Sequence, residues 1–288
     1  MIQKRLSFLA GESEDPLVPL ELPAPVPAEE GFASLSDTNL GYWDTGGNGP
    51  PIILAHPGSG SALVWGYQQP VFAKAGYRVI AYTRRNFYNS DPAPLENPGS
   101  QVEDLNNFVD YLDLKKFHLV GCAAGGGVAA DYSFSHPERL LSIVVCSNAF
   151  GVRSGDIAAA GKRIRPQDQW QHLPRSFREL GPSYRAANPE GVKKWIENNE
   201  RSELGEGGRQ ETTNVITPES LEELELPVLL MTGDSDTSTP PSILRMVAGR
   251  ISNCQISIVA ECGHSIYWER PDIFNNTILE FIFRQAQK

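Results

Sequence analysis

The residues with the greatest potential for chemistry follow apolar runs of the chain. Asp234 and Asp236 come after the run 228–232, and His264 comes after the run 255–259. Acyl-transfer enzymes need a nucleophile, a base that takes its proton, an acid that orients the base, and two N–H donors for the oxyanion. A carboxylate and an imidazole at strand ends are candidates for two of these parts, and small-residue turns are candidates for the others.

The small-residue turn lies in the stretch 118–132, His-Leu-Val-Gly-Cys-Ala-Ala-Gly-Gly-Gly-Val-Ala-Ala-Asp-Tyr. It resembles the nucleophile elbow of the α/β-hydrolase superfamily, Gly-x-Ser-x-Gly, in which small neighbours permit a strained turn. With Gly121 and Gly125 aligned to the two glycines, the nucleophile position holds Ala123, which has no group that could attack a substrate. An alternative register makes Cys122 the nucleophile. The competing interpretation is that Cys122 is a buried packing residue.

The stretch 54–65, Leu-Ala-His-Pro-Gly-Ser-Gly-Ser-Ala-Leu-Val-Trp, is similar to the oxyanion loop of the same family, with Pro57 in place of the usual glycine. This resemblance implies that the backbone N–H groups of Gly58 and Ala124 form the oxyanion hole. Neither N–H group belongs to a side chain, so the alanine at position 123 does not remove the predicted oxyanion hole. We expect His56 to shape the loop and to take no part in proton transfer.

The acid and the base are assigned through the resemblance. Leu-Pro-Val-Leu-Leu-Met-Thr-Gly-Asp-Ser-Asp (226–236) is similar to the family's late strand, whose acid ends a Gly-x-x-Asp motif, hence Asp236. Asp234 is interpreted as a loop-capping carboxylate. His264 lies in a Gly-His turn followed by Glu-x-Pro and a last helix, as the family's catalytic histidine does. The other histidines, His118, His136 and His172, are interpreted as structural.

The stretch 82–91, Tyr-Thr-Arg-Arg-Asn-Phe-Tyr-Asn-Ser-Asp, resembles the family loop Asp-x-Arg-Gly-x-Gly-x-Ser. Asn86 and Tyr88 occupy positions where glycines are common, which predicts a bulkier loop near the pocket. We interpret Arg84 and Arg85 as structural partners of nearby carboxylates and not as substrate contacts.

The elements that must position these residues alternate along the chain. A hairpin is predicted at 32–35 and 39–43, and apolar strands at 51–55, 77–82, 117–121, 141–146, 228–232 and 255–259. Fully apolar strands are typical of a mostly parallel sheet with helices on both faces. The predicted fold class is therefore α/β, an α/β-hydrolase fold with an inserted helical cap.

Domain boundaries follow from composition. Residues 1–30 form a Pro-rich arm, 31–150 and 226–288 form the core, and 151–225, where the alternation of strands and helices stops, form the cap. The cap enters after a strand end, where open α/β sheets bind ligands. Its aromatic residues suggest a mainly hydrophobic substrate, and we expect the residues that contact it to include His56, Cys122, Trp170 and Tyr184.

Composition limits the partners. The formal net charge of −10 argues against nucleic acid, because phosphate binding needs gathered Lys and Arg. The four cysteines lack the spacing of metal sites and are expected to be reduced and buried. No window approaches the roughly 18 apolar residues of a membrane span. We therefore expect a soluble, cytoplasmic protein with a small-molecule substrate and no metal or cofactor; the oligomeric state cannot be predicted.

Two interpretations of Ala123 stay open. It either replaces a serine in an inactivated enzyme, or it is natural, as in a subgroup with Gly-Cys-Ala-Ala-Gly-Gly at the elbow. The leading functional hypothesis is an enzyme acting on an ester or lactone with a His264–Asp236 dyad. The alternatives are a carbon–carbon bond hydrolase, a lyase or isomerase that needs no nucleophile, and a binding receptor or pseudoenzyme.

Two further residues bear on the substrate. Carbon–carbon hydrolases of the family often have Trp after the catalytic His, where this chain has Ser265, which weighs against that chemistry without excluding it. Epoxide and haloalkane chemistry fit less well, because both require an Asp at position 123.

Overall fold

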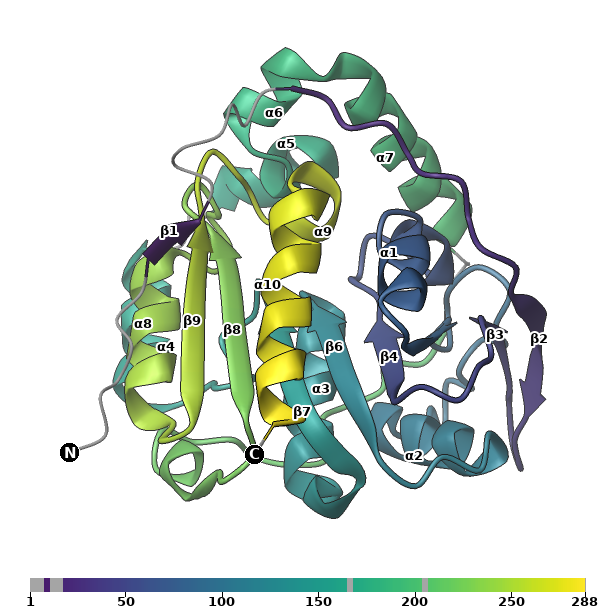
Figure 1. The fold of residues 1–288 in the computed structure, drawn as a ribbon. Helices are drawn as coiled ribbons and strands as arrows, with labels where there is room; N and C mark the ends of the chain where they lie inside the picture. Colours follow the sequence, from purple (N-terminus) through teal and green to yellow (C-terminus); the bar gives the residue numbers. More distant parts are fainter. Residues whose placement is uncertain (1–7, 11–17, 165–167, 204–206, 288) are drawn as a thin grey trace.

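A nine-stranded sheet organises the protein (Figure 1). The computed structural model describes residues 8–10, 18–164, 168–203 and 207–287. Its strand order is β1-β9-β8-β7-β6-β4-β5-β3-β2. In this order, every pair of neighbouring strands from β1 as far as β5 is parallel. At the other edge, β3 pairs antiparallel with β5, and β2 pairs antiparallel with β3. The predicted α/β-hydrolase fold is confirmed in this topology. The strands are β1 (Phe8–Ala10), β2 (Glu29–Ser34), β3 (Asn39–Asp44), β4 (Pro51–Ala55), β5 (Arg78–Tyr82), β6 (Phe117–Cys122), β7 (Leu140–Cys146), β8 (Val228–Gly233) and β9 (Cys254–Val259).

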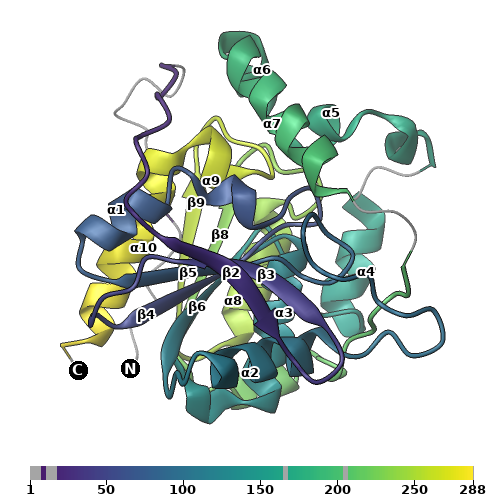
Figure 2. The same ribbon diagram turned by 90° about the vertical axis from the view of Figure 1, so that its right-hand side faces the viewer.

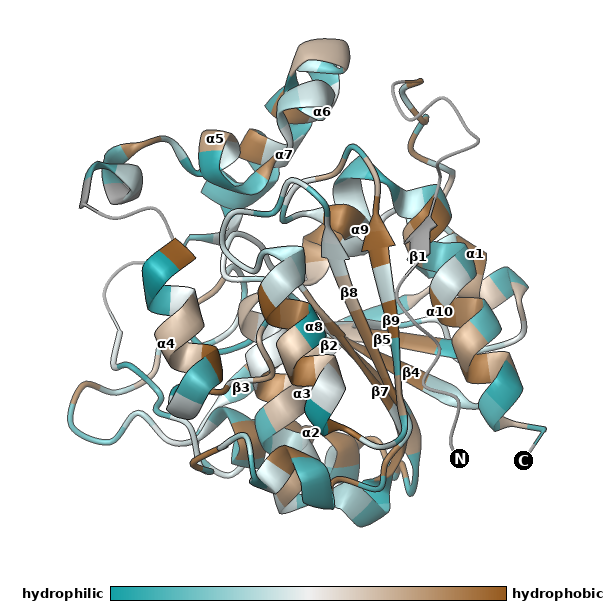
Figure 3. Cartoon of the chain, turned by 90° about the vertical axis from the view of Figure 1, so that its left-hand side faces the viewer, coloured by the Kyte–Doolittle hydropathy of each residue, from teal (hydrophilic) through white to brown (hydrophobic). Residues whose placement is uncertain are grey.

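Helices cover both faces of this sheet, which explains why the strands are apolar throughout. Alternate residues of one strand enter different layers: Ile53 belongs to the core cluster that includes residues of α2, α3 and α8, whereas Ile52 belongs to the cluster that includes residues of α1 and α10. Figure 3 shows this hydrophobic interior between polar outer surfaces. These helices are α1 (Gln69–Lys74), α2 (Gln101–Tyr111), α3 (Ala124–Ser135), α8 (Pro241–Arg250), α9 (Ile266–Glu269) and α10 (Pro271–Gln285).

The described residues between β7 and β8 include further α-helices, and we call this segment the helical insertion. Helices α5 to α7 stand beyond the carboxyl ends of the strands, as Figures 1 and 2 show. This is the edge at which the elbow and both candidate catalytic loops emerge. The insertion contains α4 (Gly155–Ile164), α5 (Arg175–Glu179), α6 (Pro182–Ala187) and α7 (Pro189–Ser202).

The N-terminal region contributes to the core more than its composition predicts. Within the predicted arm, β1 pairs in parallel with β9. Residues after 18 lie along α1, where Gln69 exchanges two hydrogen bonds with the backbone of Val26 and the Tyr67 hydroxyl donates to the carbonyl of Leu20. Among the described helices, none is long and apolar enough to cross a bilayer.

Candidate active site

Ala123 forms the turn between β6 and α3. Its backbone lies at φ 50° and ψ −111°, a region that L-residues other than glycine rarely adopt. The turn is crowded: a Cβ atom on Gly121 would lie 2.2 Å from the carbonyl oxygen of Gly125, and one on Gly125 would lie 2.1 Å from that of Ala55. Only glycine fits these two positions, so the backbone has the sharp turn that the Gly-x-x-x-Gly pattern predicts.

Hydrogen bonds hold this strained residue on both sides. The Ala123 N–H donates to the carbonyl of Cys146 at 2.8 Å, and the Asn148 side chain donates to the Ala123 carbonyl, also at 2.8 Å. What the turn presents is a methyl group, which can neither attack a substrate nor exchange a proton.

His264 and Asp236 lie together, on loops that follow β9 and β8. The His264 Nδ1 atom is 2.8 Å from Asp236 Oδ2, and the Asp236 side chain is fully buried. The backbone N–H groups of Ser238 and Thr239 donate to the other oxygen of Asp236. The carboxylate is therefore fixed in place and orients the ring. Asp234 accepts hydrogen bonds from the N–H groups at 261 and 262, in agreement with a loop-capping role.

Burial opposes protonation of the His264 ring, but the carboxylates of Asp236 and Glu179 outweigh it and raise its pKa to about 9. The ring is thus an imidazolium at neutral pH. A group that already holds a proton can act first as a proton donor, and the role of His264 as a base stays a prediction.

Glu179, at the end of α5, joins the insertion to both halves of the site. Its carboxylate accepts a hydrogen bond from the Ser59 hydroxyl at 2.6 Å, next to Gly58. Its backbone carbonyl accepts from the N–H groups of His264 and Ser265, at 2.8 and 3.2 Å. No local sequence pattern indicates this residue, because its position depends on how the insertion folds over the core.

The Glu269 side chain accepts hydrogen bonds from the loop that carries His264. Burial raises the pKa of this carboxyl to about 7, and its oxygens accept hydrogen bonds from the N–H groups of Gly263, Ser265 and Gly181. Gly181 precedes α6, so one buried side chain fixes both the turn of His264 and the insertion. In the sequence, Glu269 is the first residue of the Glu-x-Pro motif that follows His264. This motif indicated the histidine and not a role for the glutamate.

Gly58 and Ala124 face each other across the mouth of the turn. A Cβ atom on Gly58 would lie 3.6 Å from the Ala124 methyl. Ala124 is the first residue of α3, where N–H groups have no intrahelical partner, and Arg175 holds the Gly58 carbonyl at 3.0 Å. The two residues are therefore close enough to serve one oxygen, although their role as an oxyanion hole stays a prediction.

The expected substrate contacts are placed elsewhere. His56 is buried, and burial lowers its pKa well below the usual value; its Nε2 accepts from the Arg84 N–H at 3.0 Å, so it supports the loop. Cys122 is 1% exposed, and burial raises its thiol pKa, which argues against a nucleophile. Trp170 packs edge-on against Phe177. Tyr184 is buried in the insertion.

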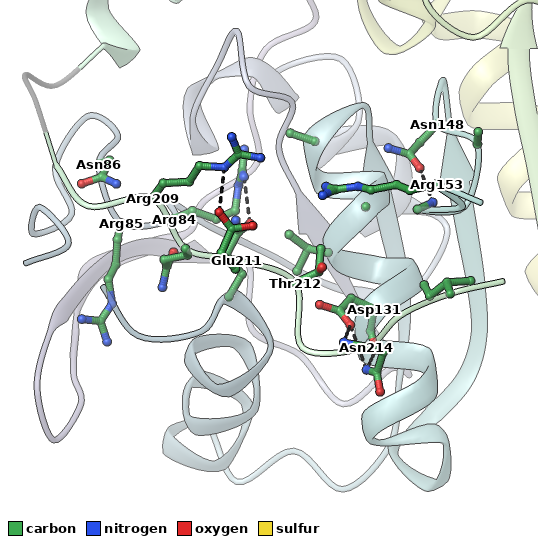
Figure 4. A pocket seen from close by; sticks show the side chains of 18 of the residues that line it. Arg84, Arg85, Asn86, Asp131, Asn148, Arg153, Arg209, Glu211, Thr212 and Asn214 are labelled. Atoms are coloured by element: carbon green, nitrogen blue, oxygen red, sulfur yellow. Dashed lines mark hydrogen bonds and ion pairs between the residues drawn. The ribbon is translucent and has the colours of Figure 1, made fainter. Parts of the chain in front are cut away.

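A cavity of about 560 Å³ opens beside the turn, and none of these four residues lines it. It meets the site at Ala124, at Asn148 and at Thr239, the residue that donates to Asp236. Its lining is rich in arginine and amide side chains (Figure 4), unlike the apolar pocket expected from the sequence. Within the described part of the chain, no group of three or more His, Cys, Asp or Glu residues could hold a metal ion.

Residues 52–277 match the model of the alpha/beta hydrolase family, so the chain belongs to this family. Among its relatives is the 2-hydroxy-6-oxo-6-phenylhexa-2,4-dienoate hydrolase of Comamonas testosteroni, 24% identical over 87% of this chain and 95% of that protein. Another is the 2-hydroxy-6-oxononadienedioate/2-hydroxy-6-oxononatrienedioate hydrolase of Paraburkholderia xenovorans, 24% identical over 85% of this chain and 91% of the relative.

Solved structures agree on the fold. A thermophilic esterase from Thermogutta terrifontis superposes with a TM-score of 0.69 at 21% identity, covering 90% of this chain and 99% of its own. The enol-lactonase from Burkholderia xenovorans gives a TM-score of 0.68 at 19% identity, covering 88% and 100%. At such identities the likeness concerns the fold alone.

Proposed function

We propose that this protein is a hydrolase that cleaves a carbon–carbon bond next to a carbonyl group, without a covalent enzyme intermediate. The observation that supports it most is that the strained elbow carries only a methyl group, whereas His264 keeps its carboxylate partner Asp236 at 2.8 Å, which raises the pKa of the ring to about 9. Such a site lacks a nucleophile but holds a proton ready for a leaving group. Cleaving a carbon–carbon bond needs that proton, because the electron pair leaves on carbon.

The proposed reaction is a direct attack by water. Water adds to the carbonyl carbon while the Glu179 carboxylate takes one of its protons, and the N–H groups of Gly58 and Ala124 stabilise the resulting oxyanion. The carbon–carbon bond then breaks, the carbonyl re-forms as a carboxylic acid, and the carbon fragment takes the proton of His264. A proton passes from Glu179 back to His264, which restores both groups.

The names of the relatives support this class of bond, since their substrates carry oxo and hydroxy groups on an unsaturated acid. Esters and lactones are the second candidate. They share the carbonyl that Gly58 and Ala124 would stabilise, but their oxygen leaving groups depend less on a proton donor. Ligand binding without turnover is the alternative of another class.

The test is turnover of a panel of 2-hydroxy-6-oxo-dienoates and of simple esters, followed by product analysis and by intact-mass measurement of the enzyme during turnover. We expect cleavage of the dienoates with no acyl adduct. His264→Ala and Glu179→Gln should each reduce turnover by about 10²-fold or more, the usual contribution of a positioned acid or base. His172→Ala and Glu190→Gln, at exposed positions of the insertion, are the matched controls.

Several outcomes would contradict the proposal. An accumulating acyl-enzyme would show a nucleophile elsewhere, and full activity of His264→Ala would exclude the proton donor. No turnover of either substrate class, together with binding that His264→Ala weakens, would establish a receptor. Loss of turnover in His264→Ala but not in Glu179→Gln would leave the proposed reaction in place and exclude Glu179 as its base.

A further inference from the structure

Three groups surround the carbonyl oxygen of Pro57, the residue before Gly58. The Arg84 guanidinium donates to it at 3.2 Å, the Gly60 N–H donates at 3.3 Å, and His56 Nδ1 lies 2.8 Å away. The same nitrogen of Arg84 also donates to the carbonyl of His56 at 3.0 Å. One guanidinium therefore holds two consecutive carbonyls of the predicted oxyanion loop.

The hydrogen bonds of the His56 ring define where its proton lies. Its Nε2 accepts the backbone N–H of Arg84 at 3.0 Å. Burial and the nearby Arg84 charge lower the pKa of the ring well below its ordinary value, so the ring is neutral. A neutral imidazole has one N–H group, which is then on Nδ1 and donates to the Pro57 carbonyl. His56 and Arg84 thus act on the same oxygen.

Arg84 directs its charge at backbone oxygens. Burial lowers its pKa to about 10, so it stays charged at neutral pH. It also donates to the Gln101 side chain at 3.1 Å and lies over the Phe87 ring. The expectation that carboxylates pair with both arginines of this loop holds for Arg85, which meets Asp104 at 2.7 Å. It is wrong for Arg84, whose acceptors are carbonyl and amide oxygens.

The peptide unit between Pro57 and Gly58 transmits this arrangement to the predicted oxyanion hole. A trans peptide is planar, and its C=O and N–H groups point in opposite directions. The Gly58 N–H therefore points away from the donors that hold the Pro57 oxygen. No described residue accepts a hydrogen bond from this N–H, and Gly58 is half-buried opposite the Ala124 methyl. The donor is fixed in direction and open to an oxygen of a ligand.

We infer that Arg84, together with His56, is a positioning residue of the oxyanion hole, which fixes the Gly58 N–H and places a positive charge behind it. The inference rests on the proposed function, in which this N–H stabilises the oxyanion. A cation that polarises the Pro57 carbonyl draws electrons from the amide, so its N–H becomes a stronger donor. The gain is larger for a charged acceptor and therefore favours the oxyanion over the neutral carbonyl.

Hydrogen exchange at Gly58 tests this charge in the unligated protein. Base-catalysed exchange removes the N–H proton for a moment, and amide resonance then places negative charge on the Pro57 oxygen, which Arg84 holds. Arg84→Met should slow this exchange at least about tenfold, the effect of losing a hydrogen bond from a charged group. Arg84→Lys keeps the charge and should restore part of the rate. Water-exchange NMR measures it, with the exposed Gly47 as internal reference.

The neighbouring arginine provides the matched control. Arg85→Met makes the same change in net charge, but its guanidinium faces Asp104 and Asp37, so it should not slow exchange at Gly58. A merely structural role of Arg84 predicts the opposite sign, because a loosened loop exchanges faster. Faster or unchanged exchange in Arg84→Met would therefore overturn the inference. If that variant does not fold, Arg84→Gln, which keeps an amide donor and removes the charge, provides the same test.

Turnover of the dienoate and ester panel gives the second readout. Arg84→Met should lower kcat at least about tenfold and leave KM nearly unchanged, because the oxyanion exists only on the way to products. Arg84→Lys should recover part of kcat. Slower exchange at Gly58 in a protein without turnover would keep the polarised donor and overturn the hydrolase. Turnover that depends on His264 but not on Arg84 would keep the hydrolase and overturn the positioning role.

Discussion

The elbow and the His264 loop are two halves of the candidate site, and they differ in which features of an acyl-transfer site each contains. The elbow has the strained backbone of a nucleophile turn, at φ 50°, but a methyl side chain. The His264 loop has both its side-chain partner, Asp236, and its backbone supports. Backbone N–H groups and an acid–base pair are therefore in place around a position that cannot form a covalent bond.

This difference indicates which part of the chemistry the fold supplies by itself. Two glycines and the first turn of α3 create the elbow, whatever side chain Ala123 carries. The dyad depends on particular side chains and on Glu269 beneath them. Backbone N–H groups can polarise a carbonyl and an imidazolium can donate a proton, and neither role needs a nucleophilic side chain at position 123.

Giving the elbow a hydroxyl should have the largest effect. We expect Ala123→Ser to cleave activated esters at least about 10²-fold faster than the unaltered protein, because the rest of an acyl-transfer site is present. Its activity should rise with pH through about 9, where His264 loses its proton and can act as a base. The unaltered protein, which would use the imidazolium, should instead lose activity over that range. Stopped assays of both proteins across this pH range test the prediction. Activities that change with pH in the same direction in both proteins would contradict it.

The next effect concerns the dyad. Asp236→Asn should destabilise the protein by about 3–5 kcal/mol near pH 6, because it removes the partner of a buried cation. The His264 pKa is raised above its unfolded value, so the stabilisation is complete below about pH 6.5 and is lost as pH rises through about 9. Urea unfolding of both proteins should therefore show a difference that shrinks with pH. A constant difference would mean that the ion pair is not its source.

A smaller loss is expected beneath the histidine loop. Glu269→Gln replaces an acceptor with an amide that must face backbone N–H groups, so we expect destabilisation by about 1–3 kcal/mol. Hydrogen exchange should also become faster at Gly181 and Gly263 together, because both donate to the same oxygen. Faster exchange at only one of them would show that the two loops are not coupled. Glu190→Gln, at an exposed position of α7, is the control.

The smallest effect should come from relaxing the elbow. Ala123→Gly should stabilise the protein by up to about 1 kcal/mol, because glycine adopts positive φ without the clash that its side chain causes in alanine. Chemical denaturation would measure it. Destabilisation would indicate that packing of the methyl group outweighs the strain.

Much of this arrangement could be predicted because local patterns encode it. Apolar runs predicted the strands, and the glycines around Ala123 predicted a turn that the backbone angles confirm. The contacts of Arg84 and Glu179 could not be predicted, since each depends on segments that are distant in the chain. Two adjacent arginines look alike in sequence, yet Arg85 pairs with Asp104, whereas Arg84 donates to carbonyl and amide oxygens and lies over the Phe87 ring.

The short strand β1 determines how much backbone the sheet exposes at one edge. It occupies the outer edge of β9, whose N–H and C=O groups would otherwise be open to the strand of another molecule. An uncovered edge strand is a template for intermolecular pairing and aggregation. The edge that the sheet presents on this side is thus a strand of only three residues, Phe8–Ala10, and such a short edge strand offers few backbone groups for pairing.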